Sequence, residues 1–458
     1  MNRINLLQTR RADLLQAGKE IRQKISALSD ENSFVEFDAY AFSENEFYGE
    51  NAQGEGVVTG FLTIDENPFY VVAQNAAVCN GGISKANCNK ITKCLKKAEL
   101  NSTPVLFLLD SCGVRAGEGV NALEGIAEVL GAMSDLKGVA TTYAVVLGNL
   151  YGSFALVAAE CDFNLMLKDS CVCYTSPAVI SASDKKFEDR DAVGGLKAQA
   201  NNNMTTFAVK DLDEAKNLIV KLCDYIAVPE EDNEDDLGRE SANLNDKADV
   251  QSLVKAVFDN GEFTEMNKGF ADEVKTGLAR IGGTSVAAVL FDGGDKGVEL
   301  TLNTVLKLKE FLYFAIDYDM PTVLFVNSLG IKADKATNDS LVMKETIHLI
   351  DALKNANLLR ISVVYGKAIG LGYTLFASKS LGSDYTYAFA NAYIGLFDSK
   401  VGASVEFEGV KESNLAQLAD KYAEENQDPV NAAKDGYVDN IIEPRHVRQY
   451  VISALQSL

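Results

Sequence analysis

The chain has 458 residues, 47% of them hydrophobic and 24% charged, which is enough for two or three domains with substantial cores. A formal net charge of −22 argues against nucleic acid or an anionic membrane surface as the main partner, although local N–H groups and a few basic side chains can still hold an anionic ligand. The eight cysteines include no CxxC pair, and the two histidines have no neighbouring Cys or His. We therefore expect reduced thiols in a cytoplasmic protein, no metal site and no Ser-His-Asp triad.

The charged N-terminus has an amphipathic pattern typical of a helix, without the apolar core of a signal peptide. Apolar periodicity and turn residues predict alternating strands and helices after it. The expected elements are a helix over 4–29, strands over 57–64 and 69–73, a helix over 85–100, a strand over 104–109, a helix over 120–135, strands over 163–167 and 171–174, and a helix over 212–227. Residues 44–55 are expected to form an acidic surface loop and residues 181–191 a charged, mobile segment.

One uncharged stretch, residues 138–159, is long enough to span a membrane. Its Gly, Asn, Ser and Thr residues and its two turn-like breaks instead favour a buried strand, a sharp turn and a buried helix. A helix that begins at Gly152 and Ser153 offers unpaired N–H groups carrying partial positive charge, and two such groups aimed into a pocket form an oxyanion hole. The alternative is an ordinary strand-to-helix turn in which glycine serves packing.

The same strand–turn–helix pattern occurs twice, because Gly148 and Gly152 are matched 218 residues later by Gly366 and Gly370. PVLFLLDSCG at 104–113 likewise returns as PTVLFVNSLG at 321–330. The sequence therefore predicts a duplicated α/β unit of about 200 residues per copy. Two oxyanion holes that faced one another would polarise two carbonyls together, which suits transfer of a group between two carbonyl-bearing partners.

An acidic stretch without aromatic residues, 229–249, predicts the linker between the copies. The expected domains are residues 1–228 and 250–458. In the first copy, residues 110–119 follow a buried strand and combine several glycines with Arg115. They form a candidate ligand loop, and the alternative is simply a tight loop at the end of a strand.

The whole chain resembles the carboxyltransferase component of biotin-dependent acyl-CoA carboxylases and decarboxylases. The resemblance rests on the order and spacing of several short motifs rather than on any one of them. They are SFVE at 33–36, GVVTG at 56–60, NGG at 80–82, DSCGVR at 110–115, VGG at 193–195, FDNGEF at 258–263, TGLARI at 276–281, KAIG at 367–370, KVGA at 400–403 and DGYVD at 435–439.

The resemblance implies two tandem crotonase-like domains, each a β-β-α spiral. The N-terminal domain would bind the acyl-CoA thioester, and the C-terminal domain of a neighbouring subunit would bind carboxybiotin. Biotin would arrive on a separate carrier protein, with a biotin carboxylase or a membrane decarboxylase subunit as a further partner. The chain would be a homo-oligomer with its sites at a dimer interface.

The same resemblance implies which residues act. N–H groups of Gly152 and Ser153 would hold the thioester enolate, and those of Leu371 and Gly372 would hold the ureido oxygen of biotin. The expected substrate-binding residues are Gly81, Gly82, Ser111, Cys112, Gly113, Arg115 and Gly148. Lysines of the helix after Gly82 could meet CoA phosphates or could simply form a solvated face: Lys85, Lys90, Lys93, Lys96 and Lys97.

The chain also departs from the family pattern. Ser153, Leu371 and Cys112 stand where glycine is usual, Asn149–Tyr151 is bulkier than the usual small residues, and the helix after Gly82 lacks the common histidine. Three readings stay open: a biotin-dependent acyl-CoA carboxyltransferase, a malonate-decarboxylase-like carboxyltransferase acting on an acyl-carrier thioester, and an inactive assembly subunit of the same fold. A one-domain hydratase or isomerase is less favoured, because the glutamate usual at such sites cannot be placed.

Overall fold

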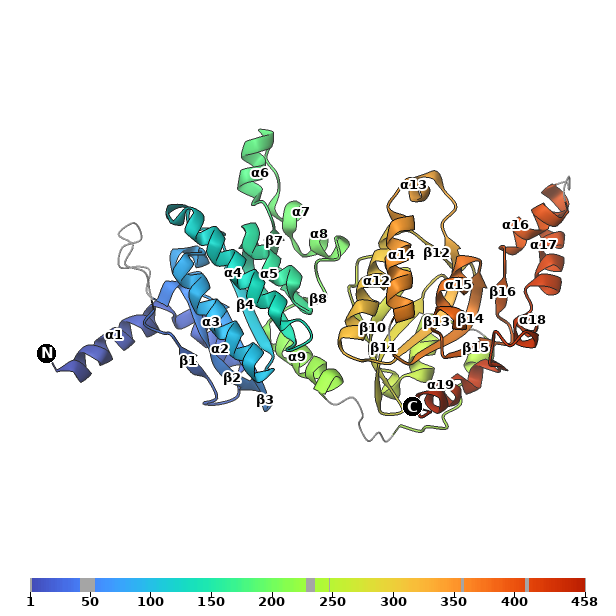
Figure 1. The fold of residues 1–458 in the computed structure, drawn as a ribbon, viewed down its shortest axis with the longest axis horizontal. Helices are drawn as coiled ribbons and strands as arrows, with labels where there is room; N and C mark the ends of the chain where they lie inside the picture. The colour runs from blue at the N-terminus through green and yellow to red at the C-terminus, as the bar shows by residue number, and fades with distance from the viewer. Residues whose placement is uncertain are drawn as a thin grey trace. The chain divides into compact units, whose positions relative to one another are not determined.

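The computed structural model describes residues 2–41, 54–227, 235–246, 248–355, 358–407 and 412–457 (Figure 1). The chain divides into two compact units, residues 1–223 (unit 1) and residues 224–458 (unit 2). Both are mixed α/β units, as the sequence predicts. None of the helices in this described part is long and apolar enough to cross a membrane.

Unit 1 is built on one sheet with the strand order β1-β2-β3-β4-β5-β6-β8, and β7 pairs with β5. The strands are β1 Val35–Phe37, β2 Val57–Ile64, β3 Asn67–Gln74, β4 Val105–Ser111, β5 Thr142–Tyr151, β6 Phe163–Leu167, β7 Cys171–Cys173 and β8 Phe207–Val209. The pairs β1–β2 and β2–β3 are antiparallel, and all pairs from β3 onward are parallel. Hairpin strands followed by parallel crossovers give the β-β-α order that the resemblance implies.

The helices of unit 1 are α1 Arg3–Ala17, α2 Lys19–Leu28, α3 Lys85–Asn101, α4 Val120–Leu136, α5 Ala155–Glu160, α6 Pro177–Asp184, α7 Arg190–Gly194, α8 Leu196–Asn201 and α9 Leu212–Ala227, with short 3-10 turns η2 Cys79–Gly81, η3 Ala116–Glu118 and η4 Gly152–Phe154. Helices α3, α4 and α5 connect successive parallel strands and bury apolar residues. Helix α3 packs on β2, β3 and α4. The five apolar residues of β4, Val105–Leu109, are fully buried, as expected for a parallel strand covered on both faces.

Unit 2 repeats this plan with the strand order β17-β15-β14-β13-β11-β10-β9, while β12 pairs with β13 and β16 with β14. Its strands are β9 Thr264–Met266, β10 Val274–Ile281, β11 Thr284–Phe291, β12 Val298–Leu300, β13 Thr322–Ile331, β14 Arg360–Ile369, β15 Tyr385–Phe389, β16 Tyr393–Gly395 and β17 Asn440–Ile442. Its helices are α10 Asn243–Asp246, α11 Val250–Val257, α12 Leu302–Asp317, α13 Lys335–Asn338, α14 Val342–Asn355, α15 Leu371–Phe376, α16 Ser399–Glu406, α17 Glu412–Asn426, α18 Pro429–Lys434 and α19 Val447–Leu455, with η5 Asp259–Gly261, η6 Lys379–Leu381 and η7 Pro444–His446.

The duplication extends to individual contacts. Gly60 of β2 lies opposite Glu36, and Gly277 of β10 lies opposite Glu265. A Cβ added to Gly60 would lie 2.4 Å from a β1 carbonyl oxygen, and one added to Gly277 would lie 2.3 Å from the corresponding β9 oxygen. Glycine is therefore needed at the same point of both copies, where two strands approach too closely for a side chain.

Three sequence predictions need correction or limitation. The single helix over 4–29 is wrong, because Gly18 separates α1 from α2. The mobile segment 181–191 in fact includes the end of α6 and the start of α7. Most of the predicted acidic loop over 44–55 lies outside the described residues.

The predicted linker, residues 229–249, is described only in part, and that part is attached to unit 2. The Nη1 atom of Arg239 lies 2.6 Å from an Asp235 carboxylate oxygen, and its Nη2 atom donates to the carbonyl of Phe258 at 3.0 Å. The Arg448 guanidinium lies 3.6 Å from Asp235. The domain limits 1–228 and 250–458 stay predictions beside the structural division after residue 223.

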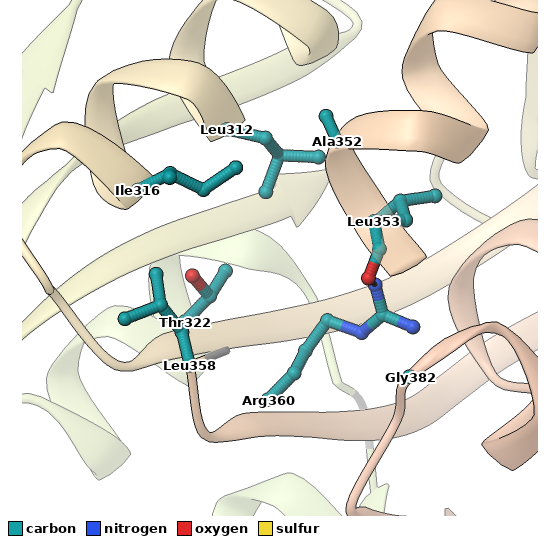
Figure 2. A pocket seen from close by; sticks show the side chains of 8 residues that line it. All are labelled: Leu312, Ile316, Thr322, Ala352, Leu353, Leu358, Arg360 and Gly382. Carbon is teal, nitrogen blue, oxygen red and sulfur yellow. Dashed lines mark hydrogen bonds between the residues drawn. The ribbon is translucent and has the colours of Figure 1, made fainter. Parts of the chain in front are cut away.

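A buried arginine closes a small cavity in the core of unit 2 (Figure 2). Leu312, Ile316, Thr322, Ala352, Leu353, Leu358, Arg360 and Gly382 line it. The Arg360 guanidinium donates to the carbonyls of Leu353 and Leu381, and burial lowers the pKa of Arg360 to about 10. The cavity measures about 10 Å³, which is room for one water molecule, so it belongs to the packing of the unit rather than to a ligand site.

Candidate functional site

The turn at the end of β5 forms as the sequence predicts. Strand β5 ends at Tyr151, the 3-10 turn η4 covers Gly152–Phe154, and α5 follows. Gly152 has φ +79°, a value that glycine adopts without strain, and its position brings the chain sharply into the helix. The first N–H groups of such a helix have no intrahelical partner and can donate hydrogen bonds to an anionic ligand atom.

Two loops pack against each other beside this turn. The Cys112 N–H donates to the carbonyl of Asn80 at 3.0 Å, and the Ile83 N–H donates to that of Gly113 at 2.9 Å. A Cβ on Gly81 would lie only 2.0 Å from the Asp110 carbonyl oxygen, and one on Gly113 would lie 3.2 Å from that of Tyr151. The structure therefore brings together the predicted residues Gly81, Gly82, Ser111, Cys112, Gly113, Gly148 and Gly152 in one region of unit 1.

Several of these residues shape the loops from within. The Ser111 hydroxyl is fully buried and accepts a hydrogen bond from the Gly113 N–H at 3.1 Å. The N–H groups of Gly81 and Gly82 donate to the carbonyls of Val78 and Cys79. Among the substrate-binding side chains predicted in this region, only that of Cys112 is exposed.

Arg115 does not reach the surface of the loop, which corrects its prediction as a ligand-binding residue. Its side chain is 2% exposed, its Nη1 lies 2.7 Å from the Glu55 carboxylate, and its Nε donates to the carbonyl of Gly82 at 3.0 Å. The Ser84 hydroxyl also donates to Glu55, at 2.8 Å. Because all of these contacts are internal, Arg115 positions the loops rather than a ligand.

Arg115→Met is expected to lower the free energy of unfolding of unit 1 by about 3–5 kcal/mol, because the buried Glu55 carboxylate would lose its cation. Denaturant unfolding measures this change. The double variant Arg115→Met/Glu55→Gln should recover part of the loss, because it removes the stranded charge. A loss below about 1 kcal/mol in the single variant would contradict the buried ion pair.

An Asp or Asn side chain supports the strand before each turn. A Cβ on Gly148 would lie 2.6 Å from Asp110 Oδ1, and one on Gly366 would lie 2.5 Å from Asn327 Oδ1. These oxygens accept hydrogen bonds from the next residues, the N–H of Asn149 at 3.2 Å and that of Lys367 at 3.0 Å. The pairing of β4 with β5, and of β13 with β14, shifts register at this point, so the side chains satisfy N–H groups that the ladder leaves free.

The two copies differ here in charge. Burial raises the pKa of Asp110 above its ordinary value of 3.8, although the Asn149 N–H partly opposes the shift. Because the native pKa lies above the unfolded pKa, the ionised Asp110 carboxylate destabilises the folded protein. The stability that protonated Asp110 contributes is therefore fully present below the unfolded pKa and is lost as the pH rises through the native pKa. Asp110→Asn, which copies Asn327, should therefore gain stability relative to the wild type between acid and neutral pH. Denaturant unfolding at a series of pH values tests this. A difference in free energy of unfolding between Asp110→Asn and the wild type that does not change with pH would contradict it.

In unit 2, a glycine lies directly in front of the turn's backbone nitrogens. Gly370 has φ +53° and precedes α15, whose first residues are Leu371 and Gly372. A Cβ on Gly330 would lie 3.2 Å from the backbone nitrogens of both Leu371 and Gly372. Because glycine carries no side chain, the space in front of both nitrogens stays free for an oxygen atom that accepts from them.

The two turns are not identical. Since Gly152 corresponds to Gly370, Ser153 corresponds to Leu371 and Phe154 to Gly372. Gly372 lies against the Ser328 carbonyl, where a Cβ would approach to 2.6 Å, whereas Phe154 is a fully buried core residue. The first turn is accordingly a 3-10 turn, and the second leads directly into a helix.

An open pocket of about 480 Å³ lies beside the second turn. Its lining residues are Gly370, Leu371, Tyr373, Thr374, Ile394, Gly395, Leu396, Ala432 and Tyr437. Most are apolar, and a volume of this size is typical of small-molecule sites. Of the residues predicted to act in unit 2, Leu371 lines this pocket with 43% of its side chain exposed, and Gly372 is buried behind it.

The lysine prediction is wrong for Lys90. It is 2% exposed, and its ammonium group donates to the carbonyls of Gly54 and Val57 at 2.9 and 2.6 Å. Burial lowers the pKa of Lys90 to about 8, and the same holds for Lys307, its counterpart in unit 2. The other four lysines are less buried: Lys85 pairs with Glu128, Lys93 lies 3.4 Å from Asp38, Lys97 covers the Phe37 ring and Lys96 is exposed.

Comparison with known proteins gives one consistent result. Residues 15–458 match the model of the carboxyl transferase domain family. The chain is 29% identical to the methylmalonyl-CoA decarboxylase subunit alpha of Veillonella parvula, over 95% of this chain and 89% of that protein. It is 27% identical to the propionyl-CoA carboxylase beta chain of Roseobacter denitrificans, over 95% of this chain and 90% of that protein. The structure of transcarboxylase 12S, a hexamer with methylmalonyl-CoA bound, superposes with a TM-score of 0.91 at 25% identity, over 99% of this chain and 94% of that chain.

Proposed function

The chain belongs to the carboxyl transferase family and transfers a carboxyl group to or from an acyl-CoA, and we propose that backbone N–H groups of its two turns hold the reacting carbonyl oxygens. The single observation that carries this proposal is the repeated strand–turn–helix, with a glycine of positive φ at the same point of both units. Hydrogen-bond donors fixed before reaction stabilise developing negative charge better than water does.

In unit 1, the N–H groups of Gly152 and Ser153 would hold the thioester oxygen as it becomes an enolate. The loops at 79–82 and 111–115 would form the floor beneath the acyl-CoA, with the Cys112 side chain facing the ligand. Acyl-CoA carboxyl transfer requires a carbanion equivalent next to the thioester, and an enolate oxygen held by two donors supplies it. This chemistry needs no nucleophilic side chain, which agrees with the exposed position of His348 on α14 and the position of His446 in the turn η7 near the C-terminus.

In unit 2, the N–H groups of Leu371 and Gly372 would hold the ureido oxygen of biotin, which carries the transferred carboxyl group on a separate carrier protein. The pocket beside Leu371 supports this proposal, since its apolar walls suit a compact ring and the turn that carries the two N–H groups adjoins it. Gly330 would keep the approach to those donors open. Biotin carboxylase or a membrane decarboxylase subunit would load or discharge the carrier, and we place the complex in the cytoplasm.

We further propose that each site is completed by a second copy of the chain, with unit 1 of one copy against unit 2 of the other. Large apolar side chains are exposed next to both turns, and clusters of such side chains are unusual for surfaces in contact only with water. In unit 1 they are Leu156 of α5 and Tyr174, which follows the strand paired with the end of β5, and in unit 2 they are Leu371, Leu396 and Tyr437 of the pocket. The hexameric assembly of transcarboxylase 12S supports a multi-copy site.

Mixing two inactive variants tests this arrangement. The two variants are Ser153→Pro, which damages the half of the site in unit 1, and Gly330→Ala, which damages the half in unit 2. If sites form between copies, unfolding and refolding the two together should restore about a quarter of wild-type activity, since half of the dimers are mixed and half of their sites are intact. Activity that stays at the level of the separate variants would place both holes of a site in one chain.

A set of CoA esters tests which acyl group the protein uses. Purified protein would be incubated with malonyl-CoA, methylmalonyl-CoA or glutaconyl-CoA and excess free biotin, and the loss of each ester would be followed. Biotin-dependent loss of one ester identifies the acyl group. Turnover of a carrier-bound thioester but of no CoA ester would favour the malonate-decarboxylase-like reading, and binding without any turnover would favour an assembly subunit.

A further inference from the structure

All eight cysteines lie in unit 1, and their exposure differs sharply. Six are buried: Cys88, Cys94, Cys161, Cys171, Cys173 and Cys223. Cys112 is exposed and Cys79 is half-buried. A reagent in solution therefore meets these two thiols before any other, and both lie on the loops that form the floor of the candidate acyl-CoA site.

The two cysteines lie on neighbouring loops although 33 residues separate them in the chain. The Cys112 sulfur lies 4.0 Å from the carbonyl oxygen of Cys79, and the Cys112 N–H donates to the carbonyl of Asn80 at 3.0 Å. The Cys79 carbonyl also accepts a hydrogen bond from the Gly82 N–H at 2.8 Å. Burial raises the pKa of the Cys112 thiol, and the nearby Cys79 raises it further.

The backbone at Cys79 is also unusual. Cys79, Asn80 and Gly81 all have positive φ, at +49°, +51° and +65°. A left-handed conformation is unfavourable for a non-glycine residue, so the fold holds the Cys79 backbone against a local preference. In this conformation the Cys79 carbonyl faces the Cys112 side chain.

We propose that small disulfides such as glutathione disulfide convert Cys79 and Cys112, the two accessible thiols of these loops, to an intramolecular disulfide that blocks the acyl-CoA site. Only the effect on activity rests on the proposed function. The formation of the bond depends on the loop geometry alone. Cys112, the more exposed thiol, reacts first.

The disulfide forms in two thiol–disulfide exchange steps. The Cys112 thiolate attacks one sulfur of glutathione disulfide, and the first glutathione leaves as a thiolate that takes up a proton. The Cys79 thiolate then attacks the Cys112 sulfur of the mixed disulfide and expels the second glutathione. Two protein thiols are oxidised, and one small disulfide is reduced to two thiols. Reduction by dithiothreitol reverses both steps.

The bond would tie the loop at 79–82 covalently to the loop at 111–115. Drawing the two sulfurs to bonding distance shifts backbone that lies against the Tyr151 carbonyl and thus against the first turn. Displacing a positioning element by about 1 Å can cost about a hundredfold in rate. We expect oxidation to leave less than a tenth of the activity of the reduced protein, and dithiothreitol to restore it.

The test begins with a mass measurement on the full-length protein. After treatment with glutathione disulfide, digestion without reductant should give a Cys79–Cys112 linked peptide as the main new species. Cys79→Ser should instead retain one glutathione on Cys112, because the second step has no attacking thiol. Cys223→Ser, which alters a buried thiol, should give the same linked peptide as the wild type. A linked peptide that is missing from the wild type, or a main linkage between other cysteines, would overturn the proposal.

Activity is compared for each variant with that of the same variant kept reduced. Wild type and Cys223→Ser should lose activity on oxidation, while Cys112→Ser should lose none. Bound CoA ester should slow formation of the linked peptide, because it covers the Cys112 loop. If the linked peptide forms and activity is unchanged, the proposed block is wrong. If the reduced protein consumes no CoA ester, the proposed function fails, while the mass result still decides whether the thiols pair.

Discussion

Gly330→Ala is expected to lower carboxyl transfer by about a hundredfold or more while unit 2 stays folded. The added Cβ would lie 3.2 Å from the nitrogens of both Leu371 and Gly372 and would crowd an oxygen that accepts from their N–H groups. Loss of one donor of an oxyanion hole typically costs about 10²–10³ in kcat, and this change obstructs two. Steady-state rates with free biotin as the acceptor measure the effect.

A matched control separates this obstruction from backbone strain. Gly330 has φ +80° and Gly138, between α4 and β5, has φ +69°. Alanine at either position pays a similar conformational cost, but a Cβ on Gly138 meets nothing within 4 Å among the described residues. Gly138→Ala should therefore keep its activity within a few fold of the wild type. Equal losses in the two variants would show that strain, and not the blocked donors, explains Gly330→Ala.

Ser153→Pro is expected to reduce transfer by about 10²–10³-fold, because proline has no N–H to donate to the thioester oxygen. Ser153 lies inside a short 3-10 turn, where the φ of about −65° required by proline is compatible with the backbone. Proline at Gly152 would be less informative, since φ +79° there cannot accommodate it and the whole turn would rearrange.

Ser153→Ala is the partner variant, because it removes the hydroxyl and keeps the N–H. Its rate should stay within a few fold of the wild type, and the circular dichroism spectra of both variants should match. If Ser153→Ala is as impaired as Ser153→Pro, the hydroxyl rather than the backbone carries the function. If both variants are fully active, the first turn does not hold a reacting oxygen.

Periodicity and repeat spacing were sufficient to predict most of the fold. The uncharged run 138–159 could be divided into strand, turn and helix because its glycines interrupt any continuous helix, and the offset between Gly152 and Gly370 gave the second copy. Gly18 was missed as a break because the amphipathic pattern runs through it on both sides. The described part of the acidic stretch before α11 reads as a linker, yet Asp235 and Arg239 find partners in unit 2.

The site was predicted less completely, because sequence shows which residues are near a turn but not which way side chains point. Arg115 was predicted at the ligand surface, and Lys90 either at CoA phosphates or on a solvated helix face, but both are turned inward to Glu55 and to backbone carbonyls. Glu55, Gly330 and the pair Asp110/Asn327 were not singled out for these roles. The internal repeat does point to Asp110, Asn327 and Gly330, because Asp110 aligns with Asn327 and Gly113 aligns with Gly330 between the two copies. No sequence pattern indicated Glu55, whose partner lies 60 residues away.

The measurement that tests the central claim most directly is transfer of a radiolabelled carboxyl group from methylmalonyl-CoA to free biotin by the purified chain alone. The proposed mechanism predicts labelled carboxybiotin at a rate proportional to protein concentration, and loss of that signal in Gly330→Ala and in Ser153→Pro but not in Gly138→Ala or Ser153→Ala. Labelled product formed equally well by all four variants would contradict the assignment of the two turns as the site of carboxyl transfer.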